Sequence, residues 1–321
     1  MQTLTVVVPA YNESEGLREF HARLAAVFDQ LDLTASVLYV DDGSRDDTWA
    51  VMESLRAGDA RVATLKLSRN FGKELALTAG LDHADADAVV VIDADLQDPP
   101  ELIAQFIARW REGYDVVYGT RSTRAGESRL KKATAAAFYR VMERLSATPV
   151  PRDTGDYRLM SRRALDALKK LRERQRFMKG LFAWVGYKQS AIVYDRDARF
   201  AGTSKFNYWR LWNFALEGIT SFSTAPLKIA TYVGVLTALL SFVFGLFVFG
   251  KALLFGDVVR GYPTLMIVVL FLGGVQLMAL GLIGEYLGRL YMEVKQRPLY
   301  LIDEHHDLDQ PELDQQDSTK R

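Results

Sequence analysis

The chain has 321 residues, of which 49% are hydrophobic, enough for one large or two modest domains with a packed core. Its 40 basic and 40 acidic residues give a formal charge of zero, so a global basic balance of the kind that favours nucleic-acid binding is excluded. The absence of cysteine excludes disulfides, thiolate metal sites and a cysteine nucleophile. The first residues lack a basic stretch followed by a long apolar one, so we expect no export signal there.

Short β-branched runs alternate with amphipathic stretches over residues 1–205, which we expect to form one α/β domain. This alternation predicts a mostly parallel sheet with helices on both faces. Ligands of such sheets bind beyond the carboxyl ends of the strands, so the residues that follow each strand are the candidates for a site. The predicted strands are 4–8, 36–40, 63–67, 88–92 and 115–118, with helical stretches such as 15–31 and 101–110 between them.

The segments that follow these strands carry carboxylates where many nucleotide-binding folds carry glycine. No G-x-G-x-x-G or G-x-x-x-x-G-K-[ST] motif is present, which excludes the glycine-cradled phosphate site of dehydrogenases and P-loop enzymes. Carboxylates hold a diphosphate only through a bridging divalent cation. Asp93 and Asp95 therefore predict a cation site for a nucleotide diphosphate, although a turn is the alternative for a lone D-x-D. The segments are PAYNE at 9–13, DDGS at 41–44, DADLQD at 93–98 and GTR at 119–121.

Two long apolar runs follow the α/β domain. Residues 229–250 and 262–284 contain no charged side chain, and each is long enough to cross a hydrocarbon core of about 30 Å as a helix. We expect a two-helix transmembrane hairpin over 226–290, and a buried helical hairpin in a soluble protein is the alternative. Lysine and arginine around the two runs favour both ends in the cytoplasm.

The hairpin is flanked by two segments of different character. Residues 206–225 place aromatic side chains at spacings of three or four, which predicts an amphipathic helix in the membrane interface or, alternatively, an ordinary core helix. Residues 291–321 form a cytoplasmic tail that becomes acidic and loses periodicity after Pro298, so we expect disorder there. His305 and His306 are adjacent, which argues against a metal site in this tail.

The motifs as a set resemble those of family 2 glycosyltransferases, in particular the polyprenyl-phosphate glycosyltransferases, and are similar to those of dolichyl-phosphate mannose synthases. RNFGKE, LFAWVG and LEGITSFSTAPL look most like the bactoprenol glucosyltransferases. The resemblance covers about residues 4 to 290. The motifs that carry it, in the family's order, are VVVPAYNE, VDDGSRDDT, LSRNFGKELALTAGLDHA, IDADLQDPPE, GTRSTR, TGDYRLMSR and RFAGTSKFNYWRL.

The resemblance implies a fold and a reaction. The fold is a GT-A type nucleotide-diphospho-sugar transferase domain, followed by the interfacial helix and two transmembrane helices. The reaction is an inverting transfer of a sugar, with UDP-glucose as the expected donor, to undecaprenyl phosphate at the cytoplasmic face of the bacterial inner membrane. The product would serve cell-envelope glycosylation of the O-antigen type. The expected partners are the nucleotide sugar, the lipid phosphate and the bilayer, without nucleic acid, and a homo-oligomer is left open.

The resemblance also implies roles for individual residues. Asp93 and Asp95 form the D-x-D pair, with Asp95 and Gln97 nearest an Mg²⁺ or Mn²⁺ ion, and Asp156 matches the position proposed as catalytic base. Because an acceptor phosphate is largely dianionic at neutral pH, Asp156 is expected to orient the acceptor or to take up its residual proton. The residues expected at the acceptor phosphate and diphosphate are Arg121, Lys132, Arg199, Ser204 and Lys205. The residues expected at the nucleotide sugar are Pro9, Tyr11, Glu13, Asp41, Asp42, Asp93 and Ala94.

Three alternatives to this function stay open. Another donor, such as GDP-mannose, UDP-N-acetylglucosamine or a further UDP-sugar, fits the same motifs. A processive polysaccharide synthase shares the catalytic fold, but its Q-x-x-R-W element is absent and two spans are too few for a polymer channel. A catalytically inactive scaffold that binds a nucleotide sugar is disfavoured because all of the strand-end carboxylates are intact.

Overall fold

The computed structural model describes residues 1–121, 154–174, 176–195, 225–255 and 261–308. These residues belong to two compact units, one built on a β-sheet and the other on two long helices. The predicted interfacial helix spans 206–225, and its residues 206–224 lie outside the described residues. So do four of the predicted acceptor residues: Lys132, Arg199, Ser204 and Lys205.

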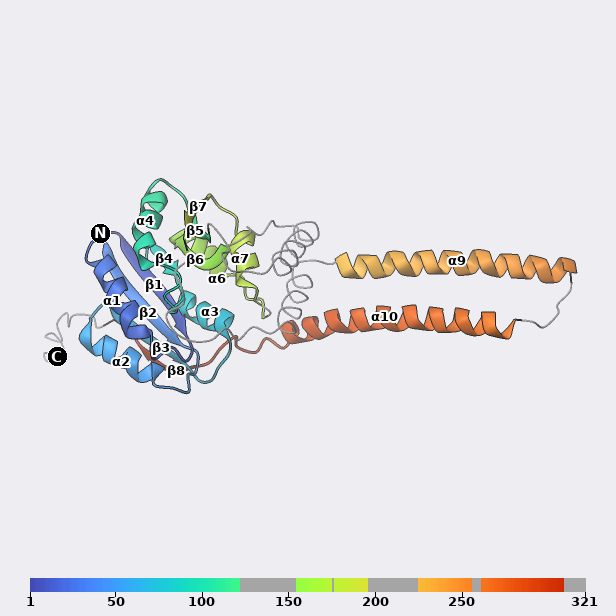
Figure 1. The fold of residues 1–321 in the computed structure, drawn as a ribbon, viewed down its shortest axis with the longest axis horizontal. Coiled ribbons are helices and arrows are strands. Elements are labelled where there is room, and N and C mark those ends of the chain that lie inside the picture. The colour runs from blue at the N-terminus through green and yellow to red at the C-terminus, as the bar shows by residue number, and fades with distance from the viewer. Residues whose placement is uncertain (122–153, 175, 196–224, 256–260, 309–321) are drawn as a thin grey trace, which may run out of the picture. The chain divides into compact units, whose positions relative to one another are not determined.

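The first unit is built on one eight-stranded sheet with the order β7-β5-β6-β4-β1-β2-β3-β8 (Figure 1). Strands β1 to β4 run parallel, as do β5 and β7, whereas β6 and β8 pair antiparallel with their neighbours. The prediction of a mostly parallel sheet is confirmed. The strands are β1 (Thr3–Ala10), β2 (Thr34–Asp41), β3 (Val62–Leu67), β4 (Ala88–Val91), β5 (Val116–Arg121), β6 (Thr154–Ser161), β7 (Gln189–Tyr194) and β8 (Ile302–His306).

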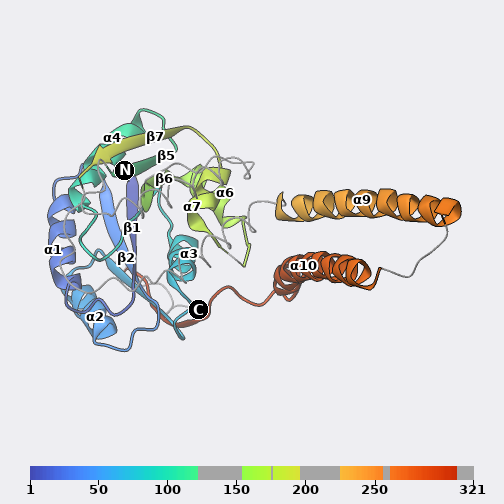
Figure 2. The ribbon, with the colours of Figure 1, turned by 45° about the vertical axis from the view of Figure 1, so that its right-hand side comes forward.

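Helices cover both faces of this sheet (Figure 2). On one face Phe20, Met52 and Phe106 join the core cluster that includes Val6 and Val8. On the other face α3 packs so closely that a Cβ added to Gly80 would lie 2.3 Å from Cγ1 of Val7. Successive side chains of β1 thus point to opposite faces of the sheet, as strand geometry requires. The helices are α1 (Leu17–Phe28), α2 (Thr48–Gly58), α3 (Lys73–His83), η1 (Pro100–Leu102), α4 (Ile103–Arg111), α6 (Arg162–Lys169) and α7 (Met178–Trp184).

The prediction that the tail is disordered is wrong for residues 302–306, which form β8 along the edge of β3. Lys66 Nζ lies 3.1 Å from a carboxylate oxygen of Asp303 and 2.6 Å from one of Glu304, so the acidity of the segment is locally balanced. The ring of His306 stacks on Trp49, with the ring centroids 6.0 Å apart. The edge of β3 offers unpaired backbone groups, and β8 satisfies them. Residues 309–321 lie outside the described residues.

The second unit contains α9 (Ala225–Phe255) and α10 (Tyr262–Val294), which lie side by side (Figure 1). Within the described residues, one helical segment, Phe271–Val294, is long and apolar enough to cross a membrane by length and composition. The apolar segment Ala230–Phe244 of α9 is shorter. Large apolar side chains are exposed along both helices, for example Phe247 at 66% and Leu277 at 71%. Such a surface suits a lipid environment.

Candidate active site

The strand-end carboxylates predicted from the sequence gather at one edge of the sheet. Parallel strands β1, β2 and β4 all end at this edge, and β6, which runs the other way, begins there. The register pairs Val91 with Arg158, so two residues farther along Asp93 comes level with Asp156. The structure therefore brings the D-x-D pair and the predicted base together.

Lys73 joins these two aspartates. Its Nζ lies 2.7 Å from a carboxylate oxygen of Asp93 and 2.7 Å from Oδ2 of Asp156. Lys73 is the first residue of α3 and follows Gly72, which has a φ of +98°. The carboxylate of Asp42 accepts hydrogen bonds from the backbone N–H groups of Phe71 and Gly72, at 2.7 Å and 2.9 Å. The buried end of β2 thus fixes the loop that presents the lysine.

The charges around Asp156 decide its protonation state. Burial alone would raise the pKa of Asp156, but the ammonium groups of Lys73 and Lys179 and the guanidinium of Arg158 lower it to about 2. Desolvation lowers the pKa of Lys73, but the carboxylates of Asp93 and Asp156 raise it well above its ordinary value. At neutral pH the site therefore holds an ionised Asp156 next to a charged lysine.

Glu74 adds a second carboxyl group beside Asp156. It accepts a hydrogen bond from the backbone N–H of Met178, the first residue of α7, at 3.1 Å. Burial raises the pKa of Glu74 to about 7, and the negative charge of Asp156 acts in the same direction, whereas Lys73 opposes it. Glu74 therefore changes its protonation state near neutral pH.

Two neighbouring loops shape the site beyond β1 and β2. Asn12, with a positive φ of 55°, donates its backbone N–H to Ser44 Oγ at 3.0 Å and accepts a hydrogen bond from the backbone N–H of Arg45 at 2.9 Å. The backbone N–H of Glu13 donates to Thr48 Oγ1 at 2.9 Å. These bonds tie the PAYNE segment to the DDGS segment, so Tyr11 and Glu13 are held at the edge where the predicted nucleoside pocket lies. Pro9 is buried within β1.

Asp41 and Asp42 are both buried at the end of β2. Oδ1 of Asp41 accepts a hydrogen bond from the backbone N–H of Ser44 at 3.1 Å, and its buried Oδ2 accepts none from the described residues. Burial raises the pKa of Asp41, and it also raises the pKa of Asp42. The two aspartates have different roles. Asp42 supports the loop before α3. Asp41 has one carboxylate oxygen, Oδ2, that accepts no hydrogen bond from the described part of the chain.

The turn after β4 carries the residues predicted to hold a metal. Oδ1 of Asp95 accepts a hydrogen bond from the backbone N–H of Gln97 at 3.2 Å, and Ala94 is buried beneath the turn. Within the described ranges, no group of three or more histidine, aspartate or glutamate side chains gathers closely enough to hold a metal by itself. Mg²⁺ usually takes one or two carboxylates and completes its shell with substrate phosphates and water. The oxygen ligands offered by Asp93, Asp95 and Gln97 fit that pattern.

Asp98, the third acidic residue of DADLQD, serves the scaffold. It is 1% exposed and accepts a hydrogen bond from Oη of Tyr194 on β7. Oη of Tyr157 donates to the backbone carbonyl of Pro99 at 2.8 Å. Side chains of β6 and β7 therefore anchor the turn that contains Asp98 and Pro99.

Arg121 is the one predicted acceptor residue with a described backbone position. It is the last residue of β5, and its neighbour Thr120 lies opposite Thr154 at the start of β6. Arg121 is thus at the same edge of the sheet as Asp156.

Sequence reasoning did not assign a role to Lys73 or Glu74, although their segment, RNFGKE, entered the resemblance. Both follow β3 at its carboxyl end, the place where ligands of parallel sheets bind. Applying that rule to the third strand as well as to the others would have singled them out.

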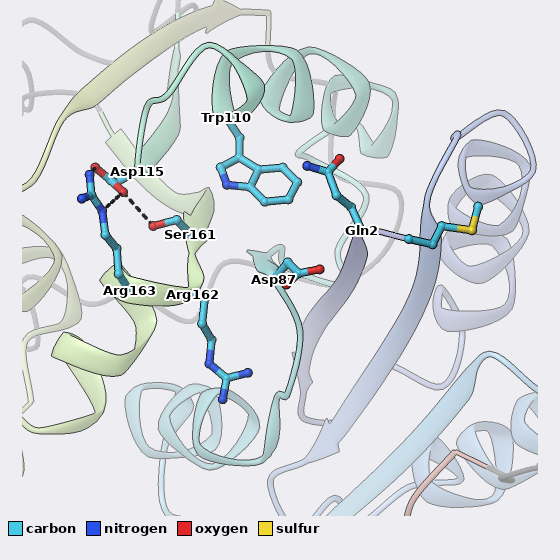
Figure 3. Close-up of a pocket in the computed structure, with 8 residues that line it drawn as sticks. Gln2, Asp87, Trp110, Asp115, Ser161, Arg162 and Arg163 are labelled. Atoms are coloured by element: carbon cyan, nitrogen blue, oxygen red, sulfur yellow. Dashed lines mark hydrogen bonds and ion pairs between the residues drawn. The ribbon is translucent and has the colours of Figure 1, made fainter.

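A pocket elsewhere in the domain is lined by none of these residues (Figure 3). It lies where β1, β4 and β5 begin, which is the opposite edge of the sheet from the carboxylates. The guanidinium of Arg163 pairs with Asp115 there, and Ser161 Oγ donates to Asp115 at 2.9 Å. This pocket is a separate feature, and its other arginine, Arg162, pairs with Asp85 and Asp166 outside the lining. It is lined by Met1, Gln2, Asp87, Trp110, Asp115, Ser161, Arg162 and Arg163.

Comparison with known proteins places this geometry in a family. Residues 5–169 match the family model "Glycosyl transferase family 2", and residues 225–290 match "GtrB C-terminal hairpin". The chain is 52% identical over 299 residues to an uncharacterized glycosyltransferase of Synechocystis sp., covering 93% of this chain and 94% of the relative. It is 46% identical over 303 residues to the SfII prophage-derived bactoprenol glucosyl transferase of Shigella flexneri, covering 94% and 98%.

Among solved structures, the mannosyl-3-phosphoglycerate synthase from Rubrobacter xylanophilus aligns with a TM-score of 0.47 and 18% identity, over 67% of this chain and 71% of that one. The family match and the two relatives cover the strand-end carboxylates and the long helices alike. The chain is a glycosyltransferase and belongs to glycosyl transferase family 2, with the C-terminal hairpin of the GtrB type.

Proposed function

We propose that the protein transfers glucose from UDP-glucose to undecaprenyl phosphate at the cytoplasmic face of a bacterial membrane. The observation that carries this proposal is the 46% identity, over 94% of the chain, with a relative named as a bactoprenol glucosyl transferase. The hairpin match over residues 225–290 supports it, because an enzyme that acts on a lipid phosphate works at a membrane surface. The grouped carboxylates of Asp93, Asp95 and Asp156 favour an enzyme over an inactive scaffold.

The proposed reaction is a single displacement with inversion. An oxygen of the lipid phosphate attacks the anomeric carbon in line with the bond to the diphosphate, and the new C–O bond forms as the old one breaks. The electron pair of the broken bond leaves with UDP. A bound Mg²⁺ or Mn²⁺, held by Asp95 and Gln97 next to Asp93, would neutralise negative charge on the diphosphate.

Asp156 acts mainly by position in this proposal. A carboxylate with a pKa of about 2 is a weak base, and a phosphate that is largely dianionic at neutral pH has little need of one. The carboxylate instead accepts a hydrogen bond from the sugar or from the residual monoanionic phosphate, with Lys73 keeping it ionised. Asp93, which follows β4, lies on the side of the site where the donor would bind.

The nucleoside half of the donor would lie over β1 and β2. Oδ2 of Asp41, which is buried and accepts no hydrogen bond from the described residues, suits an N–H donor of the base. Pro9, Tyr11, Glu13, Asp42 and Ala94 stay predicted neighbours of the nucleotide sugar. The predicted residues at the acceptor phosphate and diphosphate stay Arg121, Lys132, Arg199, Ser204 and Lys205.

We further propose that α9 and α10 cross the membrane as a pair, with the sheet domain and the tail in the cytoplasm. An even number of spans returns the chain to the side on which it started. This arrangement agrees with β8, which follows α10 in the chain and pairs with β3 of the sheet domain.

The test uses membranes that contain the full-length protein, undecaprenyl phosphate, Mg²⁺ and labelled UDP-glucose, and it measures the label that moves into the organic phase. Asp95→Ala removes the predicted metal ligand. Asp32→Ala is the matched control, because Asp32 is exposed and precedes β2 at the opposite edge of the sheet. We expect transfer by the wild type and by Asp32→Ala, and loss of transfer with EDTA or in Asp95→Ala.

Other outcomes separate the alternatives. Label that moves only from another UDP-sugar or from GDP-mannose would keep the reaction and replace the donor. Nucleotide-sugar binding without transfer from any donor would favour the scaffold. Full activity of Asp95→Ala would overturn the metal-site assignment.

A further inference from the structure

The ammonium group of Lys73 is more open to a ligand than the carboxylates it joins. Its side chain is 45% exposed, whereas those of Asp93 and Asp156 are 25% and 10% exposed. A lysine has three N–H donors, and Lys73 makes one side-chain hydrogen bond to Asp93 and one to Asp156. One donor therefore remains for a group that enters from the solvent side.

An incoming phosphate needs a positive charge at this place. The acceptor carries nearly two negative charges at neutral pH, and it approaches carboxylates at Asp156 and Asp93 that would repel it. Arg158 is near Asp156 but already engaged: it is 5% exposed, donates to the backbone carbonyls of Gly155 and Asp156, and lies 3.7 Å from the centre of the Phe182 ring. Lys73, by contrast, bonds Asp156 directly, and its side chain is half exposed.

The two carboxylates that Lys73 bonds place its ammonium group between the predicted donor and acceptor sides of the site. Asp93 follows β4 and Asp156 lies in the adjacent strand β6, whereas the predicted nucleoside loops follow β1 and β2 on the other side of β4. Lys73 therefore contacts Asp156, on the predicted acceptor side, as well as Asp93.

We propose that Lys73 binds the phosphate of the lipid acceptor and holds it beside Asp156, an inference that rests on the proposed function. The remaining N–H donates to a phosphate oxygen other than the attacking one. The ion pairs to Asp93 and Asp156 restrict the lysine to one position, so it links the donor side of the site to the acceptor side. Lys73 adds no covalent step to the reaction.

The test measures binding in the absence of any donor, with full-length protein in detergent micelles. The probes are a short-chain polyprenyl phosphate, the matching polyprenol, and UDP with Mg²⁺. Lys73→Met removes the charge and Lys73→Arg keeps it. Lys188→Met is the control, because Lys188 is exposed, lies over the ring of Tyr114 and precedes β7 at the opposite edge of the sheet.

We expect the wild type to prefer the phosphate to the alcohol, and Lys73→Met to lose roughly 10- to 100-fold of that preference, the size of one charge-assisted hydrogen bond. Lys73→Arg should recover most of it, Lys188→Met should match the wild type, and UDP affinity should be unchanged throughout. A Lys73→Met protein that keeps the full preference overturns the inference. So does one that loses UDP and phosphate affinity equally, because that indicates general damage to the site.

Turnover separates this inference from the proposed function. A wild type that shows the phosphate preference but uses another sugar donor refutes the glucose assignment and leaves the role of Lys73 supported. A wild type that transfers glucose while Lys73→Met keeps the phosphate preference supports the function and refutes the role. A wild type without any phosphate preference refutes both.

Discussion

The carboxylate of Asp42 accepts a hydrogen bond from the backbone N–H of Gly72, with a donor–acceptor distance of 2.9 Å. The residue after Gly72 is Lys73, which bridges Asp93 and Asp156. Gly72 has a φ of +98°, a conformation that residues with a Cβ rarely adopt. The backbone at this glycine therefore sets where the lysine enters the site.

Replacement of Gly72 by alanine tests this dependence. We expect Gly72→Ala to cost about 1 kcal/mol in the free energy of unfolding and to lower kcat/KM roughly tenfold or more, because the loop relieves its strain by moving Lys73. Gly113→Ala is a matched control: Gly113 has a φ of +87°, and nothing lies within 4 Å of a Cβ added at either glycine. Thermal unfolding and transfer assays on both variants check the expectation, and equal losses of activity would contradict it.

The sequence predicted the parts of the site that local patterns encode. Buried β-branched runs mark β1, β2 and β4, and the carboxylates Asp41, Asp93 and Asp95 follow them directly, so their common edge could be inferred from strand order alone. Asp156 was found through its motif. Its alignment with Asp93 depends on the antiparallel register of β4 and β6, strands far apart in the chain.

The parts that were not predicted depend on distant contacts. The segment that forms β8 is acidic and has no apolar alternation, so nothing local distinguishes it from a disordered tail. Its order comes from the edge of β3 and from Lys66, which is 238 residues from Glu304 along the chain. The role of Lys73 likewise arises from partners on other strands, and its own neighbourhood in the sequence reads only as the start of a helix.

The pKa of Glu74 gives a prediction about pH. Folding raises this pKa from 4.5 to about 7, so the folded state favours the neutral carboxyl group. The associated stabilisation is complete below the unfolded value and is lost as the pH rises through about 7. We expect the wild type to lose Tm between about pH 5 and pH 8 relative to Glu74→Gln, which stays neutral. Parallel Tm curves for the two proteins would refute this.

Glu19→Gln serves as the control for the pH series. Glu19 is exposed in the first turn of α1, so its replacement changes the net charge by the same amount without altering a buried group. Its Tm curve should run parallel to that of the wild type.

Removal of β8 should destabilise the sheet domain. A chain that ends after residue 299 loses the backbone pairing with β3, the Lys66 ion pairs and the stacking of His306 on Trp49. We expect its Tm to fall by roughly 5–10 °C, from hydrogen bonds worth about 1 kcal/mol each. A chain that ends after residue 308 keeps β8 and is the control. Differential scanning fluorimetry of both chains makes the comparison, and equal Tm values would show that β8 adds nothing to stability.

Tyr194→Phe separates the scaffold role of Asp98 from the metal site. The change removes the O–H that donates to a carboxylate only 1% exposed, so we expect a loss of about 1–3 kcal/mol and a Tm lower by roughly 3–10 °C. The Mg²⁺ concentration that gives half-maximal transfer should not change, because the predicted ligands are Asp95 and Gln97. Tyr187→Phe, at a tyrosine that is 46% exposed, should leave both quantities unchanged. An increased Mg²⁺ requirement in Tyr194→Phe would instead place Asp98 among the groups that hold the metal.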